Sequence, residues 1–358
     1  MPLREHTISD VAALAGVSSS SVSRYLNGHR VRQADLIAGA ITKLSYEPSP
    51  IARSLRSGRT QSVGVIVADV ANPFFAFAFK GIESEIRQTG ASTPAPIQLF
   101  LCNTEESVER LLVLLDSLSG RVDGLIIAPP VESPPPEDLL RQRVPVVLLD
   151  REFSGPAFAD SVLVDNAGGV VSAVTHLAEL GHQRIGFISG PLDSTPGRGR
   201  FEGYCQGMDV CGLPMSDGLV ATGDFREQGG QKGVRSLLEL DPPPTALVSG
   251  NNLMSLGALA ELARREVQVP EEISFVGFDD LEAAALLRPA VTTISRPMEE
   301  QGAAAMRLLR ARLRGEEGPP QRIVLPTRLT IRGSTTSPPA CCPAVRMSEK
   351  TQQEVASP

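Results

Sequence analysis

The sequence has no apolar run long enough to span a membrane and no early apolar segment followed by a cleavage site, so nothing in it indicates secretion. Its five cysteines have neither zinc-binding nor disulfide spacing, and we expect a protein of the reducing cytoplasm. Two of them, Cys341 and Cys342, are neighbours in a segment rich in proline and polar residues. That composition predicts a disordered tail over residues 334–358.

Arrangements of catalytic residues are also missing. Asp279 and Asp280 are adjacent, and neighbours on an extended segment face opposite sides. The Gly-Arg-Gly sequence at 197–199 lacks both the Lys-Ser/Thr pair of a phosphate-binding loop and the full dinucleotide fingerprint. His176 and His182 have no third metal ligand nearby in the sequence, and His182 is interpreted as part of a helix terminus. We therefore predict a protein that is not an enzyme and needs no metal or cofactor.

Charge is distributed unevenly along the chain. Residues 1–60 contain eight Lys or Arg and four Asp or Glu, which gives 8 − 4 = +4. Because the whole chain carries −7, the remainder carries −7 − 4 = −11. A basic N-terminal segment on an acidic body suits phosphate binding by that segment alone.

The segment 7–27 contains two short helical patterns joined by a tight turn. Thr7 can cap the first helix while Asp10 returns the bond, as in a capping box. Gly16 can adopt the left-handed conformation that ends a helix, and Ser18 then offers an oxygen to the free amides of the next helix. The pattern predicts a helix-turn-helix motif, which is typical of DNA-binding proteins.

The second of these helices is rich in small hydroxylated side chains. Val22 and Leu26 lie on one face, so the opposite face can present Ser19, Ser20, Ser23 and Arg24 outward. An outward arginine can bond guanine in the major groove, and short hydroxyls allow close approach. The alternative is an ordinary helical hairpin with solvated serines. An apolar stripe then predicts a third helix that closes a small core; it consists of Leu36, Ile37, Ala40, Ile41 and Leu44.

Residues 48–61 are predicted to form a hinge helix and linker after an N-terminal domain at 1–47. Pro48 and Pro50 break the preceding helix, and the following segment can make only a short helix, which is marginal alone in water. Ala52 permits close approach of a symmetry mate, and Leu55 has the shape of a wedge between base steps. Three arginines of this segment are expected to meet phosphates: Arg53, Arg56 and Arg59.

From residue 62 onward, apolar runs alternate with helical stretches, which predicts an α/β core over 62–333. The first doubly wound unit is expected to have strands at 63–67, 97–101, 124–128 and 146–149, with helices at 76–88 and 108–118. The second unit is expected to begin near 162, with late crossovers near 291 and 323. Its strands are predicted at 184–188, 219–220, 246–249 and 274–278, and its helices near 170–180, 200–210, 228–238 and 255–265.

Open sheets bind ligands at the carboxyl ends of their strands, which identifies a set of candidate cleft residues. Acids, amides and a guanidinium can bind hydroxyls, while phenylalanine faces stack on sugars or bases. The alternatives are that the aspartates cap helices, the phenylalanines belong to the core and the arginine pairs at the surface. The candidates are Asn72, Phe74, Phe75, Asp150, Arg200, Phe225, Asn251 and Asp279.

The chain resembles the LacI/GalR family of transcription regulators over residues 7–332, through motifs that occur in register: DVAALAGVSSSSVSRYLNG, YEPSPIARSLRSG, NPFF, LLDR, VDN, ELGHQRIGFISG, GRFEGY, VPEEISFVGFDD and VTTI. The resemblance implies a helix-turn-helix domain, a hinge helix and a periplasmic-binding-protein-like core of two α/β subdomains. It implies base reading by Ser19, Ser20 and Arg24, backbone contacts by Ser18, Ser21, Ser23 and Asn27, an intercalating Leu55, and effector contacts by Arg200, Asn251 and Asp279. Thr7, Ala52 and Arg53 complete the predicted DNA-binding set.

The sequence departs from the family pattern at two places. The stretch 27–40 is shorter than is usual, so Arg30 and Arg32 are either replacement contacts or solvated loop charges. Asn252 stands where the family usually has an aspartate, which bears on the geometry around Asn251.

We thus expect a DNA-binding repressor controlled by a small effector. The resemblance implies a sugar or sugar derivative, with a purine-like ligand second because phenylalanines could stack on a base. No leucine heptad follows Arg332, so a homodimer on operator DNA is the expectation, without a membrane partner. The alternatives are a ligand-binding protein of the periplasmic sugar-binding type and a hydrolase or isomerase on the same scaffold.

Overall fold

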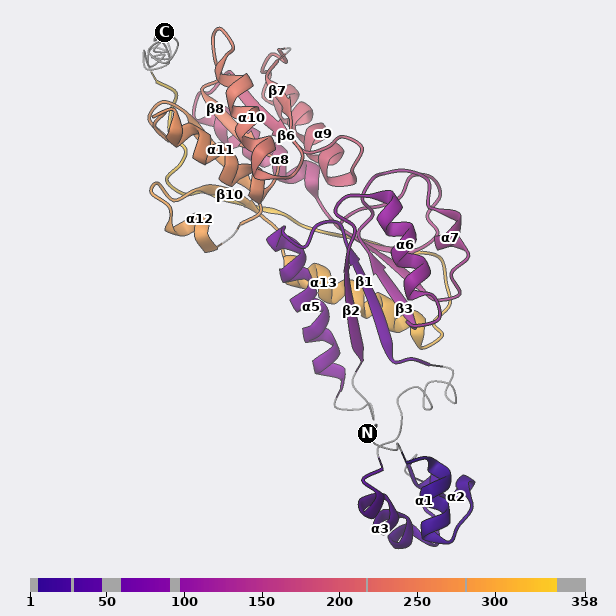
Figure 1. The fold of residues 1–358 in the computed structure, drawn as a ribbon. Helices are drawn as coiled ribbons and strands as arrows, with labels where there is room; N and C mark the ends of the chain where they lie inside the picture. The colour runs from indigo at the N-terminus through magenta and orange to yellow at the C-terminus, as the bar shows by residue number, and fades with distance from the viewer. Residues whose placement is uncertain are drawn as a thin grey trace, which may run out of the picture. The chain divides into compact units, whose positions relative to one another are not determined.

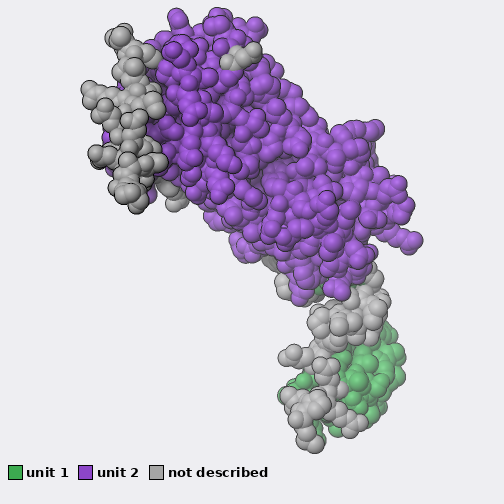
Figure 2. Space-filling model, turned by 45° about the horizontal axis from the view of Figure 1, so that its top comes forward, with its two compact units in different colours: residues 1–61 green, residues 62–358 purple. Residues whose placement is uncertain are grey.

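A computed structural model describes residues 6–26, 29–46, 59–90, 97–216, 218–280 and 282–339. The chain divides into two compact units, residues 1–61 and 62–358, which Figure 2 shows in different colours. Seven residues of the N-terminal domain and hinge named above lie outside the described ranges or in their gaps, so their predictions remain untested: Asn27, Pro48, Pro50, Ala52, Arg53, Leu55 and Arg56. The same holds for Cys341 and Cys342.

The described part of the first unit contains helices α1 (Ile8–Ala15), α2 (Ser19–Leu26) and α3 (Ala34–Leu44). The predicted capping box is present, because the backbone N–H of Thr7 donates to Asp10 Oδ2 (2.7 Å) and that of Asp10 donates to Thr7 Oγ1 (3.3 Å). Gly16 ends α1 with φ of 65°, a left-handed conformation that suits glycine. Ser18 Oγ accepts from the N–H of Ser21 (3.2 Å), so α2 also begins at a capping side chain.

A small apolar core closes the three helices. Its buried members are Val11, Ala12, Ala15, Val22, Ile37 and Ala40. Leu36 was expected in this core, and that prediction is wrong, because its side chain is 60% exposed. Leu36 lies at the edge of the stripe centred on Ile37 and Ala40, and the two short helices beside α3 do not reach that far around it.

The first sheet of the second unit has strand order β11-β5-β4-β3-β1-β2, with all neighbours parallel. We call this sheet and its helices the first lobe. The four inner strands of this sheet are buried on both faces by helices, which explains their continuous apolar runs, whereas the two edge strands are partly exposed. The strands are β1 (Ser62–Val67), β2 (Gln98–Asn103), β3 (Gly124–Ile127), β4 (Val146–Leu149), β5 (Asp160–Val164) and β11 (Arg322–Leu325). The helices are α5 (Pro73–Gly90), α6 (Val108–Leu118), α7 (Glu137–Leu140) and α13 (Met298–Leu313).

Helices α5 and α13 lie side by side on one face of this sheet (Figure 1). Glycines let their backbones nearly touch. A Cβ atom on Gly81 would lie 1.8 Å from the carbonyl oxygen of Glu299, and one on Gly302 would lie 1.8 Å from that of Ala78. This close contact ties a helix from late in the chain to the first lobe.

The second sheet, which with its helices forms the second lobe, has the order β12-β10-β9-β8-β6-β7. Its strands run parallel except that β12 is antiparallel to β10. The strands are β6 (Ile185–Ser189), β7 (Val220–Thr222), β8 (Ala246–Ser249), β9 (Ser274–Phe278), β10 (Thr292–Ser295) and β12 (Arg328–Thr330). The helices are α8 (Asn166–Glu179), α9 (Thr195–Val210), α10 (Glu227–Leu238), α11 (Asn252–Arg264) and α12 (Glu282–Leu286).

The chain crosses between the lobes three times: after β5, between β10 and α13, and between β11 and β12. The second subdomain was expected to begin near 162, but β5 pairs with β4 and therefore belongs to the first sheet. A buried parallel strand has the same apolar sequence in either sheet, so composition did not reveal which sheet takes β5.

The second lobe continues past residue 333, where disorder was expected. Ser334 is fully buried; its Oγ donates to the carbonyl oxygen of Phe275 (2.6 Å) and accepts from the N–H of Thr292 (2.8 Å). The carbonyl oxygen of Thr336 accepts from the ring Nε2 of His182 (2.8 Å). The predicted start of the tail is therefore wrong: hydroxyls that satisfy buried polar groups hold 334–336 against the second sheet.

Candidate DNA-reading helix and effector cavity

Helix α2 presents a polar face away from the small core. Ser19, Ser20 and Arg24 are exposed, whereas Val22 on the opposite face is fully buried. Of the other predicted contacts, Thr7 and Ser18 are exposed and Ser21 and Ser23 are half-buried. The structure thus places short hydroxyls and one guanidinium together on an accessible helix surface, which is the arrangement that base reading in a groove requires.

All eight candidate cleft residues line one cavity between the two lobes. Asn72, Phe74, Phe75 and Asp150 come from the first lobe, and the other four come from the second. Three further residues line it that sequence reasoning did not select: Arg151, Pro196 and Arg296. The carboxyl ends of parallel strands from two sheets face each other here, as the topology leads one to expect.

Three of the lining residues have a left-handed backbone although none is glycine. Asp150 follows β4 with φ of 66°, Asp279 follows β9 with φ of 72°, and Phe225 has φ of 61°. This conformation is uncommon for residues with a Cβ atom and tends to occur at functional sites. The strand ends are therefore shaped to turn these side chains into the cavity.

Arg296 joins the two lobes inside the cavity. Its Nη1 donates to Asp150 Oδ1 (2.5 Å), while Nε and Nη2 donate to the two carboxylate oxygens of Asp279 (2.5 and 3.2 Å). Its guanidinium carbon lies 3.7 Å from the centre of the Phe74 ring. Burial opposes ionisation of both Asp150 and Arg296, yet the opposite charges prevail: they lower the pKa of Asp150 and raise that of Arg296.

Arg200 is buried without a carboxylate partner. Its Nε donates to Asn166 Oδ1 (2.8 Å) and its Nη1 to the carbonyl oxygen of Gly250 (2.5 Å). The guanidinium lies 3.7 Å from the centre of the Phe278 ring. Burial, together with the positive charge of Arg296, lowers the pKa of Arg200 to about 10. A surface ion pair, the alternative considered for this arginine, does not apply.

The amides at the cavity have mostly structural partners. Asn251 Oδ1 caps α11 by accepting from the N–H of Met254 (2.9 Å), and its Nδ2 donates to the carbonyl oxygen of Phe225 (2.9 Å). Asn252 Nδ2 donates across the lobes to Asn72 Oδ1 (3.0 Å). An aspartate at position 252 could not donate this bond when ionised, so the departure from the family pattern creates a contact between the lobes.

Arg151, which sequence reasoning missed, holds the first-lobe wall. Its two Nη atoms donate to the carboxylate of Glu106 (2.5 and 2.8 Å), and Nη1 also reaches the carbonyl oxygens of Pro129 and Pro130. A signal for both missed arginines existed, because Arg151 follows Asp150 at the end of β4 and Arg296 directly follows β10. The strand β10 itself was not predicted.

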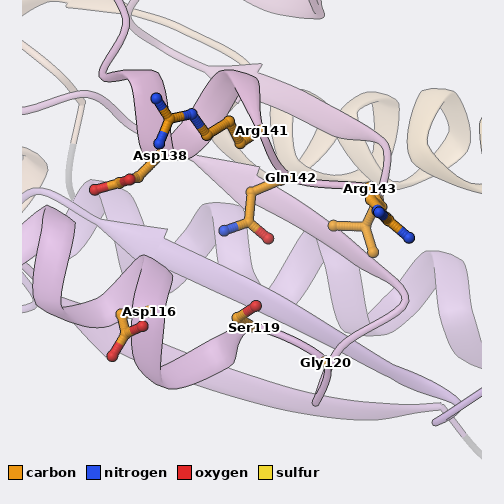
Figure 3. A pocket seen from close by; sticks show the side chains of 8 residues that line it. Asp116, Ser119, Gly120, Asp138, Arg141, Gln142 and Arg143 are labelled. Carbon is orange, nitrogen blue, oxygen red and sulfur yellow. The ribbon is translucent and has the colours of Figure 1, made fainter.

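A second hollow in the first lobe contains none of the candidate residues. It lies between the end of α6 and the segment from α7 to β4, at the end of the sheet opposite to the cavity. Figure 3 shows Asp116 and Ser119 at the end of α6, and Asp138 and Arg141 from α7 and its end across the hollow. Its charged lining includes both signs, and Arg141 already pairs with Glu137 (2.6 Å).

Two properties of the described part of the chain bear on other functions. No group of three or more His, Cys, Asp or Glu side chains is placed there to hold a metal ion. Nor does any described helix combine the length and apolar character needed to cross a membrane.

An N-terminal helix-turn-helix unit and a two-lobed cavity define a class, the ligand-controlled DNA-binding regulators. Comparison with known proteins agrees. Residues 7–49 match the model for bacterial regulatory proteins of the lacI family, and residues 174–335 match that for a periplasmic binding protein-like domain. The ribose operon repressor of Escherichia coli K12 is 38% identical over 337 residues, covering 92% of this chain and 99% of the repressor.

Two further relatives extend this result. The HTH-type transcriptional repressor PurR of Haemophilus influenzae is 35% identical over 342 residues, covering 92% of this chain and 99% of PurR. The crystal structure of the lac repressor dimer bound to operator and the anti-inducer ONPF is 26% identical with a TM-score of 0.79, covering 93% and 100% of the two chains.

The chain belongs to the LacI family and is a DNA-binding transcriptional regulator, which confirms the predicted fold class and function. Repressors of this family are regulators without enzymatic activity, so the hydrolase or isomerase alternative is set aside.

Proposed function

We propose that this protein is a repressor whose affinity for operator DNA is set by a sugar or sugar derivative bound between the two lobes. The observation that carries the proposal is the cavity lined by all eight candidate residues from both lobes. A ligand there contacts both lobes at once, so its binding energy depends on their closure. The periplasmic binding alternative does not account for the helix-turn-helix unit.

The DNA-reading surface is assigned to α2. Ser19, Ser20 and Arg24 read base edges, and Ser18, Ser21 and Ser23 contact the backbone, in support of which the structure offers an exposed polar helix face. Thr7 supports this surface by capping α1. The remaining assignments rest on the sequence alone, with Leu55 as a minor-groove wedge; they are Asn27, Ala52, Arg53 and Leu55.

A sugar is favoured over a purine as the effector. Among the relatives, the ribose operon repressor names a sugar operon, and its identity to this chain exceeds that of PurR. Two of the three phenylalanines that could stack on a base already contact guanidinium groups: Phe74 lies under Arg296, and the ring centre of Phe225 lies 5.6 Å from the guanidinium of Arg151 and 5.9 Å from that of Arg200. A purine-like ligand remains the second candidate.

The proposed assembly is a homodimer on a palindromic operator in the cytoplasm. The lac repressor structure is a dimer bound to operator. In this chain β2 is an edge strand of the first sheet, and Phe100 and Leu101 on it are exposed. Exposed apolar residues on an edge strand support pairing with a second copy.

The test has two stages. The full chain is used to select duplexes from a random pool at about 0.15 M salt, the physiological ionic strength. Release of the selected duplex is then measured with a panel of sugars, sugar derivatives and nucleobases. We expect a palindromic consensus and a change in operator affinity with a sugar compound. Absence of any selected sequence, or of any response to the sugars, would contradict the proposal.

A further inference from the structure

The walls of the cavity are almost completely shielded from solvent. Asn72 is half-buried, and the other ten residues that line the cavity are buried. The three crossover segments connect the lobes where β5 and β11 lie in one sheet and β10 and β12 in the other. A ligand would have to pass these segments to enter from that side. The mouth of the cavity therefore lies on the opposite side, between the loops after β1 and β3 and those after β6, β7 and β8.

Polar contacts join the two lobes across this mouth. The N–H of Glu132, in the loop after β3, donates to the carbonyl oxygen of Asp193 in the loop after β6 (2.6 Å). The carboxylate of Glu132 also forms an ion pair with Arg198 of α9, with 2.6 Å between Oε2 and Nη2. Asp69, after β1, and Arg226, after β7, form a second ion pair with 3.7 Å between Oδ2 and Nε. Each of these bonds has to break when the lobes separate.

A further contact across the mouth is almost fully buried. Asn252 Nδ2 donates to Asn72 Oδ1 (3.0 Å), and the same oxygen accepts from the N–H of Phe74 (3.0 Å). Asn252 is only 3% exposed, so water does not compete for this bond. The carboxylates of both ion pairs are also mostly buried, with exposed fractions of 14% for Glu132 and 16% for Asp69. Partly buried charges are screened by salt less than surface charges are.

The apolar cores, in contrast, do not cross the mouth. Within the described residues of the second unit, two apolar clusters lie in the first lobe and two others lie in the second lobe. Separation of the lobes therefore leaves each core intact and exposes little apolar surface. Because the hydrophobic effect scales with the apolar area removed from water, it contributes little to closure. The polar contacts at the mouth thus decide whether the lobes stay together.

We propose that the contacts at the mouth form a latch that holds the cavity closed, and that an effector enters only when the latch opens. The latch consists of three pairs, Glu132 with Arg198, Asp69 with Arg226, and Asn72 with Asn252. Every partner belongs to the protein itself, so closure needs no ligand; the consequence for an effector rests on the proposed function. Because only the open form admits an effector, its apparent affinity is reduced by the fraction of molecules that are open.

Opening is measured by alkylation of a thiol placed behind the latch. Pro196 is buried, lines the cavity and lies in the first turn of α9, which makes Pro196→Cys a suitable probe position in the full chain. N-ethylmaleimide, a neutral reagent similar in size to a monosaccharide, labels the thiol, and mass spectrometry of the peptide that contains position 196 separates it from the native cysteines. Ser119→Cys, at the exposed end of α6, gives the rate of an open site.

The salt dependence of labelling tests the ion pairs. We expect the thiol of Pro196→Cys to react much more slowly than that of Ser119→Cys. Relative to Ser119→Cys, its rate should rise about twofold between about 0.1 M and about 1 M salt, because the Debye length falls from about 10 Å to about 3 Å.

Arg198→Gln, made in the Pro196→Cys chain, tests one ion pair directly. We expect labelling to become about threefold faster, within the range that partly exposed ion pairs contribute. Removal of a nearby cation raises the pKa of a thiol and slows its intrinsic reaction, so acceleration reports opening. Adding Glu132→Gln should change little more, because both substitutions remove the same contact. The matched control is Arg141→Gln, whose exposed ion pair with Glu137 lies outside the mouth.

Asn252→Asp tests the buried contact. An ionised carboxylate cannot donate to Asn72 Oδ1 and repels it, so we expect about tenfold faster labelling. Asn252 is the first residue of α11, where a negative charge is favourable. Resistance to denaturant should therefore not fall, and faster labelling with unchanged unfolding separates opening of the latch from general destabilisation.

The outcomes separate the latch from the proposed function. The latch is overturned if the thiol of Pro196→Cys reacts as fast as that of Ser119→Cys, or if both Arg198→Gln and Asn252→Asp leave its rate unchanged. Labelling that behaves as expected, combined with sugars that never alter operator affinity, supports the latch and contradicts the regulatory proposal. Sugars that release operator from a chain whose cavity thiol is freely accessible do the reverse.

Discussion

The proposed DNA-reading surface of α2 and the proposed effector cavity between the lobes prepare their polar groups in opposite ways. The side chains of Ser19, Ser20 and Arg24 are exposed to water. In the cavity, Arg296 and Asp279 are buried and already bond each other. In the proposed function, DNA would therefore replace water at α2, whereas an effector would have to exchange bonds that the protein makes with itself. The affinity at α2 would depend mainly on the fit of the DNA. The affinity in the cavity would depend also on the free energy needed to break the bonds between Arg296 and the aspartates.

The largest expected effect is at the cavity. Asp279→Asn removes the carboxylate that meets two nitrogens of Arg296, so a buried cation loses one of its two partners. We expect the free energy of unfolding to fall by about 3–5 kcal/mol, as measured by circular dichroism in denaturant. Asp280→Asn is the control, because its pair with Arg332 is partly exposed. Equal losses in the two variants would show that burial does not distinguish them.

At the α2 surface the expected loss is in specificity and not in stability. Arg24→Ala should cost about 1–3 kcal/mol of discrimination between the selected operator and duplexes changed at one base pair, measured by competition binding. Unfolding should be unaffected, since Arg24 is exposed. Lys43→Ala, which removes an exposed cation on α3 that is not among the predicted contacts, is the matched control. Unchanged base preference would remove Arg24 from the reading set.

A smaller loss of stability is expected from the capping box of α1, the helix that packs beside α2. Thr7→Ala removes the oxygen that accepts from the N–H of Asp10 and should destabilise the first unit by about 1 kcal/mol. Hydrogen exchange of peptides from 6–26 measures this in the full chain. Thr42→Ala is the control, because its hydroxyl bonds the carbonyl oxygen of Ala38 inside a helix, where that bond adds little. Equal exchange in the two variants would argue against the cap.

The smallest effect concerns pH. Burial lowers the pKa of His182 below that of the same side chain in the unfolded chain. The unfolded chain thus takes up the proton first, so stability is full above about pH 6.5 and falls as pH decreases towards the folded pKa. Denaturant unfolding at several pH values measures this slope. His182→Gln should flatten it, and an unaltered slope would mean that other groups cause it.

Much of the fold was predictable because its signals are local. Capping at Thr7 and Gly16 and the apolar runs of the parallel strands each depend on a few neighbouring residues. Most of the eight cavity residues were also found from local information, because ligands lie at the carboxyl ends of strands. Arg200 and Phe225 were instead expected in loops of the second unit, and Arg200 in fact lies inside α9.

The features that the sequence did not predict depend on contacts between distant parts of the chain. Asp150 and Arg296 are 146 residues apart in sequence, and only the crossover between β10 and α13 brings them together. The assignment of β5 to the first sheet and the packing of Ser334 against Phe275 likewise depend on pairing partners that the local sequence does not reveal. Leu36 was misplaced because a helix stripe has edges that only the neighbouring helices define.

Arg296 lies in one of the three crossover segments that connect the lobes, directly between the end of β10 and the start of α13. Its side chain therefore lines the cavity while its backbone belongs to a connection that would have to bend if the lobes moved relative to each other. A ligand that changes the partners of this guanidinium acts on the pivot itself. One residue would then both contact the ligand and lie in the segment that bends, so ligand binding could change the angle between the lobes without a change inside either lobe.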